Sequence, residues 1–453
     1  MRLVILTPGA GGMYCGNCFR DNALAQALIR QGHSVVLLPL YLPMTLDEST
    51  ATAPGIPTFF GGINVYLSQK FGFYRSAPAW LRRLFDHPRL LKMVSRRAAN
   101  TDARLLGEMN VSMLLGEEGN QVRELDDLLE WLRQQPKPDA ILLSNALLVG
   151  FVRRLKQELK TRIIVCLQGE EAFLDSMLEP WRTQSWDTVA ERGSEVDGWL
   201  AASRHFANRM GERLGIPSAR LHVVPNGIQL DGYRQLPPRE AKQPGAPMTI
   251  GFFSRMCPEK GMDIVIDAFL ALRKTGQWNH LQLEIGGGCG AGEKAYVDEQ
   301  RLRVEKAGLS ASVHFYPNIS REEKIAFYAR CDVTCVPARQ SEAFGICLIE
   351  SLAAGTPVIQ PEWVTYPELI QSTRGGILYS PHTTLGLAEA LASALSNPAR
   401  LRHLGETGRM SVFEHYSDDV MAQNVVRAVS RIVPTFHEMA SESSRAANRP
   451  SVT

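Results

Sequence analysis

Short apolar runs alternate with stretches of helical length along almost the whole chain, and this alternation limits the fold more than any other feature of the sequence. Apolar runs at 3–7 and 162–167 are typical of buried strands, and the stretch at 17–31 has the length and pattern of a helix. The same alternation restarts with an apolar run at 248–254. Strands that are apolar throughout and are joined by helices are typical of parallel sheets covered on both faces. We therefore predict an α/β fold.

The chain is expected to form two such units with a cleft between them. Its 453 residues exceed one ordinary hydrophobic core, and a stretch rich in Pro and Gly at 236–247 has the composition of a linker or a long surface loop. We assign 1–224 to a first domain and 225–416 to a second domain. The polar tail at 436–453 lacks periodicity and is expected to be disordered. Ligands usually bind in the clefts between domains.

Charge and hydropathy narrow the classes of partner. The chain holds 49 Lys and Arg against 47 Asp and Glu, so no global positive field points to nucleic acid. The apolar run at 3–7 is shorter than the core of a signal peptide, and no stretch reaches the ~18 apolar residues of a membrane span, so we expect a cytoplasmic protein. A segment at 78–97 mixes Trp, Phe and Leu with Arg and Lys, which leaves open a peripheral contact with an anionic membrane surface. The commoner alternative is a helix that packs its apolar side on its own domain.

Two glutamates in the second half of the chain are spaced as a ligand site would need. The apolar run at 333–337 ends at a polar loop with Glu342, a helix is expected to begin near Phe344, and Glu350 follows about two turns later. Both carboxylates then face the crevice beyond the strand ends, where ligands bind in open α/β sheets. Eight residues at a rise of ~1.5 Å span ~12 Å, about the length of a sugar diphosphate. One carboxylate can hold sugar hydroxyls and the other a ribose, with the unpaired amides of the helix start between them.

A pair of cations follows another strand of the same unit. Arg255 and Lys260 flank the turn after the apolar run at 248–254. Two cations aimed at a departing diphosphate would stabilise its developing negative charge without a metal. Consistent with this, the chain contains no Asp-x-Asp. Taken alone, this cluster could also be a salt-bridged turn at the surface.

Five segments resemble a known family, namely "SEAFGICLIESLAAGTPVI", "GFFSRMCPEKGMDIVIDAF", "LQLEIGGG", "SVHFYPNISREEKIAFYARCDV" and "VVPNGI". They are similar to the nucleotide-sugar-binding half of the retaining GT-B glycosyltransferases of family 4, or group 1, over about 221–377. The resemblance implies two Rossmann-like domains facing each other across a cleft, with a C-terminal helix at 417–435 that crosses back to the first domain. It implies transfer of a sugar from a nucleotide-sugar donor to an acceptor hydroxyl, with retention and without metal or cofactor, in glycan, glycolipid or cell-envelope polysaccharide biosynthesis. It leaves the donor base, the sugar and the acceptor open; the acceptor can be a sugar, a lipid-linked sugar or a small molecule.

The resemblance also implies roles for individual residues. Glu342 would contact the donor sugar and Glu350 the ribose. Arg255 and Lys260 would bind the diphosphate, and together with Glu342 they would carry catalysis. The other donor-binding residues that the resemblance implies are Gly11, Gly12, Tyr316, Ala343, Phe344, Gly345 and Ile346.

On the acceptor side the sequence departs from the family pattern. Many members carry a His at the end of a first-domain strand, close to the reacting sugar, where this chain has Gln168 and Glu170. Either this polar pair fills the same space, or the acceptor is held differently. The two residues are therefore the candidates for contact with the acceptor.

Three rival functions stay open at this stage, and one of them is a peripheral membrane-binding module that uses the segment at 78–97. Cys15 and Cys18 stand in the stretch "GAGGMYCGNCFRD" and could form a thioredoxin-like redox pair or half of a zinc site. The glycine loop before them fits a phosphate neighbour better, so we interpret the cysteines as small residues at the mouth of the donor site. The third rival is a nucleotide-sugar epimerase of the same fold, which would need acid and base residues placed for proton transfer.

Overall fold

The computed structural model describes most of the chain. The described residues are 1–9, 16–42, 103–239 and 246–433, together with 44, 46, 48–52, 59, 60, 65, 67, 69 and 242. Five sequence-based predictions fall outside them: the roles of Gly11, Gly12 and Cys15, the basic segment at 78–97, and the tail at 436–453.

The first domain is built on a parallel six-stranded sheet in the order β2-β1-β3-β4-β5-β6. Its strands are β1 (Arg2–Thr7), β2 (Ser34–Pro39), β3 (Ala140–Leu143), β4 (Arg162–Leu167), β5 (Gly198–Ala201) and β6 (Leu221–Val223). In β1, Leu3 and Ile5 pack into one hydrophobic cluster, while Val4 and Leu6 pack into another on the opposite face. Because both faces are covered, the four central residues of the strand, Leu3 to Leu6, are all apolar instead of alternating with polar residues.

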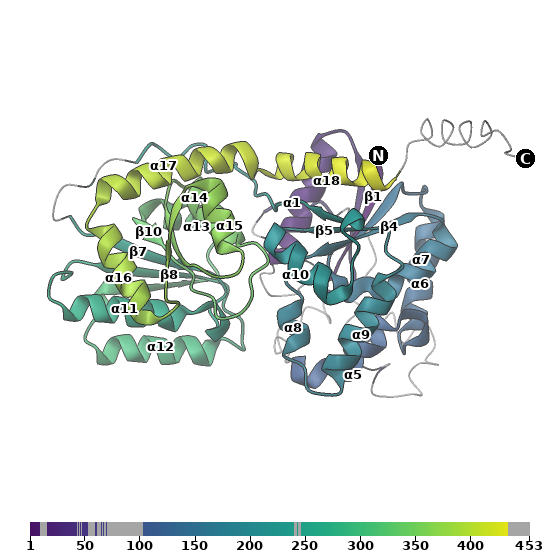
Figure 1. Ribbon diagram of the computed structural model, residues 1–453, viewed down its shortest axis with the longest axis horizontal. Helices are drawn as coiled ribbons and strands as arrows, with labels where there is room; N and C mark the ends of the chain where they lie inside the picture. Colours follow the sequence, from purple (N-terminus) through teal and green to yellow (C-terminus); the bar gives the residue numbers. More distant parts are fainter. Residues whose placement is uncertain are drawn as a thin grey trace, which may run out of the picture.

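Helices cover both faces of this sheet. The helices of the first domain are α1 (Gly16–Arg30), α5 (Ala103–Leu114), α6 (Val122–Gln134), α7 (Val152–Leu159), α8 (Glu171–Asp175), α9 (Trp181–Gly193) and α10 (Arg204–Leu214). Side chains of α6, α7, α9 and α10 share the cluster on one face, and α1 supplies the other face. The start of α1 lies beyond the end of β1, at the edge of the sheet that faces the second domain (Figure 1).

The second domain repeats the design with the strand order β12-β11-β10-β7-β8-β9. Its strands are β7 (Thr249–Phe253), β8 (Gln282–Gly287), β9 (Val313–Pro317), β10 (Val333–Thr334), β11 (Val358–Pro361) and β12 (Gly376–Tyr379). Its helices are α11 (Met262–Lys274), α12 (Lys294–Lys306), α13 (Arg321–Arg330), α14 (Ile346–Ala353), α15 (Tyr366–Thr373), α16 (Thr384–Leu395) and α17 (Pro398–His415). β7 and β10 are neighbours, but the chain continues from β7 to β8 on one side and from β10 to β11 on the other. In parallel sheets, ligands bind in the crevice between two strands whose connections diverge in this way, which is called the switch point.

The last described helix joins the two domains. In Figure 1, α17 runs along the second domain and α18 (Asp418–Ile432) continues over the first. Met421, Val425 and Val429 pack with Leu24 and Leu28 of α1 in one buried cluster. The side chain of Asp418 also accepts a hydrogen bond from Arg30 Nη2 at 2.7 Å. A helix from the C-terminal end of the described chain therefore completes the core of the first domain, as the resemblance implied.

Two local details differ from the expectations. Helix α14 begins at Ile346 and not near Phe344, because Gly345 has a φ of 100°, which a right-handed helix does not allow. Glu342 therefore lies in a loop, and a helical rise over all eight residues does not give its separation from Glu350. Strand β10 covers only Val333–Thr334 of the expected run at 333–337.

Candidate functional site

A cavity of about 540 Å³ lies in the cleft between the two domains. The second domain lines it with residues that follow β7 and β10 and with the start of α14, and the first domain lines it with the start of α1 and the turn after β4. Its size lies in the range of pockets that hold small molecules and cofactors. The predicted crevice site and the interdomain cleft are therefore the same place.

Direct contacts hold the two domains together beside this cavity. Ser203 Oγ donates a hydrogen bond to the Ala343 carbonyl oxygen at 2.8 Å. The Glu368 carboxylate accepts hydrogen bonds from the backbone N–H groups of Arg204 and His205, both at 2.9 Å. A carboxylate from the second domain thus satisfies unpaired amides at the N-terminus of α10 in the first, where the helix dipole also favours it.

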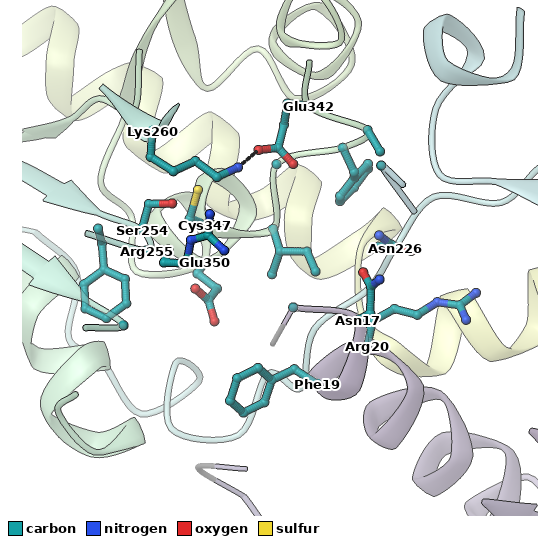
Figure 2. A pocket seen from close by; sticks show the side chains of 18 of the residues that line it. Asn17, Phe19, Arg20, Asn226, Ser254, Arg255, Lys260, Glu342, Cys347 and Glu350 are labelled. Atoms are coloured by element: carbon teal, nitrogen blue, oxygen red, sulfur yellow. Dashed lines mark hydrogen bonds and ion pairs between the residues drawn. The ribbon is translucent and has the colours of Figure 1, made fainter. Parts of the chain in front are cut away.

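Lys260 and Glu342 form an ion pair in the cavity, beyond the C-terminal ends of β7 and β10. A 3-10 turn over Pro258–Lys260 follows β7, and it brings Lys260 Nζ to 2.5 Å from Glu342 Oε2 (Figure 2). Burial lowers the pKa of Lys260, but the Glu342 carboxylate more than offsets this, so the pKa lies above its usual value. Lys260 is therefore a protonated cation beside the Glu342 carboxylate.

Glu350 lies one turn into α14 and also meets a lysine. Lys324 Nζ is 2.8 Å from Glu350 Oε1, and the Tyr328 hydroxyl donates a hydrogen bond to Glu350 Oε2 at 3.3 Å. Both partners come from α13. Each carboxylate that the sequence analysis singled out is thus paired with a lysine in the cleft.

Arg255 is held less tightly than the two lysines. Its Nε donates a hydrogen bond to Cys257 Sγ at 3.2 Å, and the carboxylates of Glu259 and Glu293 each approach its guanidinium only to 3.9 Å. Burial lowers the pKa of Arg255, and the neighbouring Cys257 and carboxylates raise it to a net value above the usual one. Because its side chain is half-exposed and lines the cavity, the guanidinium can turn toward an anion.

The start of α14 adds an electropositive helix end to the cavity. Gly345 is the N-cap, and no side chain caps the first amides of the helix. The loop and the first turn, Ala343, Phe344, Gly345 and Ile346, all line the cavity. Unpaired amides and the helix dipole favour a negative group at this point.

The two acceptor-side candidates point in different directions. Gln168 lines the cavity, and its Oε1 accepts a hydrogen bond from Asn226 Nδ2 at 3.3 Å. Glu170 is buried, and its carboxylate accepts hydrogen bonds from the backbone N–H groups of Gln168 at 2.7 Å and Ala146 at 3.0 Å. Burial raises the pKa of Glu170. Gln168 is thus available to a ligand, whereas Glu170 fastens two backbone segments together.

Tyr316 is placed beside the cavity and not in its lining. Its ring lies under the Arg330 guanidinium, 4.6 Å from the ring centroid, and its hydroxyl donates a hydrogen bond to Glu284 Oε1 at 3.4 Å. The same turn contributes Asn318 to the cavity. A contact between Tyr316 and the base of a nucleotide stays a prediction.

The sequence analysis missed several residues that line the cavity. They are Asn17, Phe19, Arg20, Glu48, Asn226, Asn318, Arg321 and Lys324. Figure 2 shows Phe19 opposite Glu350, while the Arg20 guanidinium points away from the two carboxylates. Arg20 is buried and pairs with Asp21 at 2.8 Å. Phe19 and Arg20 could have been identified from the stretch "CFRD", because an aromatic residue and a charged pair directly follow the glycine loop there.

Neither a metal-ligand cluster nor a membrane-spanning helix occurs in the part of the chain that the structure describes. No group of three or more His, Cys, Asp and Glu side chains there is arranged to hold a metal ion. None of the helices that the structure describes combines the length and the apolar character needed to cross a bilayer.

Comparisons with known proteins identify the two halves of the chain separately. A family model described as "Glycosyl transferase 4-like domain" matches residues 22–227, and one described as "Glycosyl transferases group 1" matches residues 236–411. D-inositol 3-phosphate glycosyltransferase from Nocardia farcinica is 29% identical over 217 residues, which are 47% of this chain and 48% of that protein. Phosphatidyl-myo-inositol mannosyltransferase from Mycobacterium leprae is 29% identical over 262 residues, which are 58% of this chain and 63% of that protein. The chain thus spans from about half to just under two thirds of the length of these relatives.

Solved structures share the whole architecture. HepE from Anabaena, in complex with UDP, has a TM-score of 0.62 at 15% identity and covers 95% of this chain and 100% of its own. Sucrose-phosphate synthase from Thermosynechococcus elongatus has a TM-score of 0.64 at 16% identity, with 98% and 100% covered. The likeness confirms the predicted GT-B fold of two Rossmann-like domains. With two family models that together span most of the chain, the protein belongs to the group 1 glycosyl transferases, the family predicted from its motifs.

Proposed function

We propose that this protein is a retaining glycosyltransferase that moves a sugar from a nucleotide diphosphate sugar to a hydroxyl of an acceptor bound on the first domain. The observation that carries the proposal is the pairing of two lysines with two carboxylates in one interdomain cavity, Lys260 with Glu342 and Lys324 with Glu350. A nucleotide diphosphate sugar needs cations for its diphosphate and carboxylate acceptors for the hydroxyls at its two ends.

The chemistry follows from where charge develops. As the bond between the anomeric carbon and the diphosphate breaks, negative charge grows on the phosphate oxygens. Lys260, Arg255 and the unpaired amides at the start of α14 are the groups available to stabilise that charge. In this proposal Glu342 binds hydroxyls of the donor sugar and Glu350 binds the ribose. Domain closure brings the acceptor hydroxyl to the anomeric carbon, so the protein works by positioning and electrostatics and needs no metal.

Gln168 is the residue that we propose for the acceptor side. It lines the cavity from the first domain beside Asn226, whereas the Glu170 carboxylate is engaged with backbone amides. The names of similar proteins suggest which donors and acceptors to try first. One relative is named a GDP-mannose-dependent mannosyltransferase acting on a phosphatidylinositol monomannoside, and HepE was solved with UDP-glucose. A role in glycolipid or cell-envelope polysaccharide biosynthesis fits such substrates.

The rival functions have less support. A thiol redox protein needs an accessible, reactive thiol, and Cys18 is fully buried. An epimerase would need an acid and a base placed across a sugar, whereas the carboxylates of Glu342 and Glu350 are both paired with lysines on the second domain. The relatives named above are transferases, which favours transfer over epimerisation.

A transfer assay tests the proposal. The protein is incubated with UDP-, GDP- and ADP-linked sugars and candidate acceptors in the presence of a chelator, and release of the nucleoside diphosphate is followed together with the anomeric proton signal of the product. We expect release that depends on one base, survives chelation and gives a product with the anomeric configuration of the donor. An inverted product, or release abolished by the chelator and restored by a divalent ion, would contradict the mechanism.

A further inference from the structure

We propose that Lys324 is a positioning residue for the donor's ribose, and that it ties the ribose end of the site to the first domain through Phe19. The inference rests on the proposed function, since it assigns a role to Lys324 only if Glu350 binds the ribose of a nucleotide. Three observations carry it: the contacts of Glu350, the face of α13 that makes them, and a ring that reaches across the cleft.

Glu350 depends on α13 for its orientation. Lys324 Nζ and the Tyr328 hydroxyl hold one carboxylate oxygen each, at 2.8 and 3.3 Å. Lys324 and Glu350 are both largely buried, with side chains 10% and 13% exposed. In so little water a carboxylate without its cation would be costly, and it would turn away or take up a proton. Lys324 therefore keeps Glu350 charged and directed, which a carboxylate that accepts two ribose hydroxyls requires.

The face of α13 that carries Lys324 is turned toward the first domain. Arg321, one turn earlier, places its Nη1 3.7 Å from Glu48 Oε2 of the first domain. Arg321, Lys324 and Tyr328 follow at spacings of three and four residues and therefore share one side of the helix. The ion pair of Lys324 with Glu350 thus lies on the same side of α13 as a contact to the first domain.

Phe19 supplies the contact across the cleft. Lys324 Nζ lies 5.6 Å from the centroid of the Phe19 ring, within the range of a cation–π interaction. Phe19 is in the first turn of α1, and Figure 2 shows its ring facing Glu350 across the cavity. The contacts from Phe19 to Lys324 and from Lys324 to Glu350 thus link the first domain to the proposed ribose position. Closure of the domains and orientation of the Glu350 carboxylate therefore favour each other.

The test compares nucleotides with and without ribose hydroxyls. Isothermal titration measures Kd for the preferred nucleoside diphosphate and for its 2′-deoxy and 3′-deoxy forms, in the wild type, Lys324→Met and Lys324→Arg. Lys306→Met, at an exposed lysine of α12, is the matched control. We expect the wild type and the control to prefer the ribonucleotide by roughly tenfold or more, as for hydrogen bonds to a charged group. In Lys324→Met the ribonucleotide Kd should rise to near the deoxy values, which themselves change little, and Lys324→Arg should restore part of the preference.

Two kinds of result would overturn the inference, and they differ in what else they refute. If Lys324→Met weakens ribo and deoxy forms by the same factor, or leaves the preference intact, Lys324 does not act through the ribose, while the proposed function stands. If the wild type binds no nucleoside diphosphate or shows no ribose preference, the proposed roles of the site fail together.

Phe19→Leu provides a second, milder variant. It removes the ring but keeps an apolar side chain in α1, and it should lower the ribose preference by less than Lys324→Met does. In the Lys324→Met background it should have no further effect on that preference, because its influence passes through Lys324. Fully additive effects of the two substitutions would overturn the link to the first domain.

Discussion

Replacing Glu342 with Gln is the change that separates turnover from nucleotide binding most sharply. Gln keeps the shape of the side chain but removes the charge that lies 2.5 Å from Lys260 Nζ. Both side chains are about a quarter exposed or less, so the lost charge-assisted hydrogen bond should cost about 2 kcal/mol. If that interaction orients Lys260 and the donor sugar in the transition state, kcat falls roughly thirty-fold. The affinity for the nucleoside diphosphate should not fall, because this ligand lacks the sugar that Glu342 is proposed to bind and its phosphates no longer compete with Glu342 for Lys260.

The pH dependence of the same variant gives a second readout. The Glu342 carboxylate is what raises the pKa of Lys260 against the effect of burial. In the wild type, the pair therefore stabilises the folded protein fully below the ordinary lysine pKa, near 10.4, and this is lost as the pH rises through the higher folded value. In Glu342→Gln burial lowers the pKa of Lys260 against only the smaller raising effects of Cys347 and Cys257. The alkaline loss of nucleotide binding should thus begin at a lower pH in the variant.

Steady-state kinetics and isothermal titration measure both quantities on the same samples. Glu350→Gln is the matched control, because it makes the same chemical change at the other carboxylate. For Glu350→Gln we expect the opposite result: the nucleotide Kd rises roughly tenfold or more, and kcat changes less. Equal losses of kcat and nucleotide affinity in Glu342→Gln, or an unchanged alkaline limb, would refute the roles assigned to Glu342 and Lys260.

Three further substitutions test the surroundings of the site. Gly345→Ala should destabilise the protein by about 1–2 kcal/mol in urea unfolding, because the cost comes from a φ of 100° and not from crowding, the nearest atom being 3.5 Å from the added methyl; unchanged stability would contradict this geometry. Arg192→Met removes a side chain that is 1% exposed and pairs with Glu117 at 2.9 Å. We expect the free energy of unfolding to fall by about 3 kcal/mol, which is at the low end for a buried pair because Glu117 keeps its ion pair with Arg153. A loss below about 1 kcal/mol would show that the pair contributes no more than a surface one. Glu368→Gln should speed hydrogen exchange of the first two amides of α10 about fivefold, since it weakens a charged contact by about 1 kcal/mol; unchanged exchange would mean that the contact does not hold the domains.

Much of the fold follows from local sequence because the strands are buried on both faces. In β4 (Arg162–Leu167) every residue after Arg162 is apolar, and a helical stretch follows the strand, so its place in a parallel sheet can be predicted without any partner. The position of α18 over the first domain, by contrast, was predicted only from the resemblance to the family. The predicted domain boundaries are untested, and residues such as Leu230 and Tyr233 already pack in the core of the second domain.

Positions at the ends of elements were harder to predict, and glycines explain why. Gly345, with its positive φ, delays the start of α14 to Ile346. Gly169 has a φ of 93° and turns the chain between Gln168 and Glu170, so that one side chain faces the cavity and the other folds back onto backbone amides. A polar pair at a strand end indicates a site, but the direction of each side chain depends on such turns.

Contacts between distant segments were beyond the reach of pattern analysis. Ser203 and Ala343 are 140 residues apart in the chain, and Lys324 reads in sequence as an ordinary polar residue of an amphipathic helix. Only the approach of the two domains makes Lys324 a neighbour of both Glu350 and Phe19. The motif residues of the second domain could therefore be predicted, whereas the residues that connect them to the first domain could not.

The most direct test of the account is a thermal-shift titration of the wild type and Glu350→Gln with UDP, GDP and ADP. At a ligand concentration about 100 times Kd, binding adds about 2.7 kcal/mol to the stability of the folded protein, which is readily seen as a higher Tm. The account predicts a clear shift with one of the three nucleotides in the wild type and a much smaller one in Glu350→Gln. No shift with any of them, or the same shift in both proteins, would contradict a nucleotide site built on Glu350.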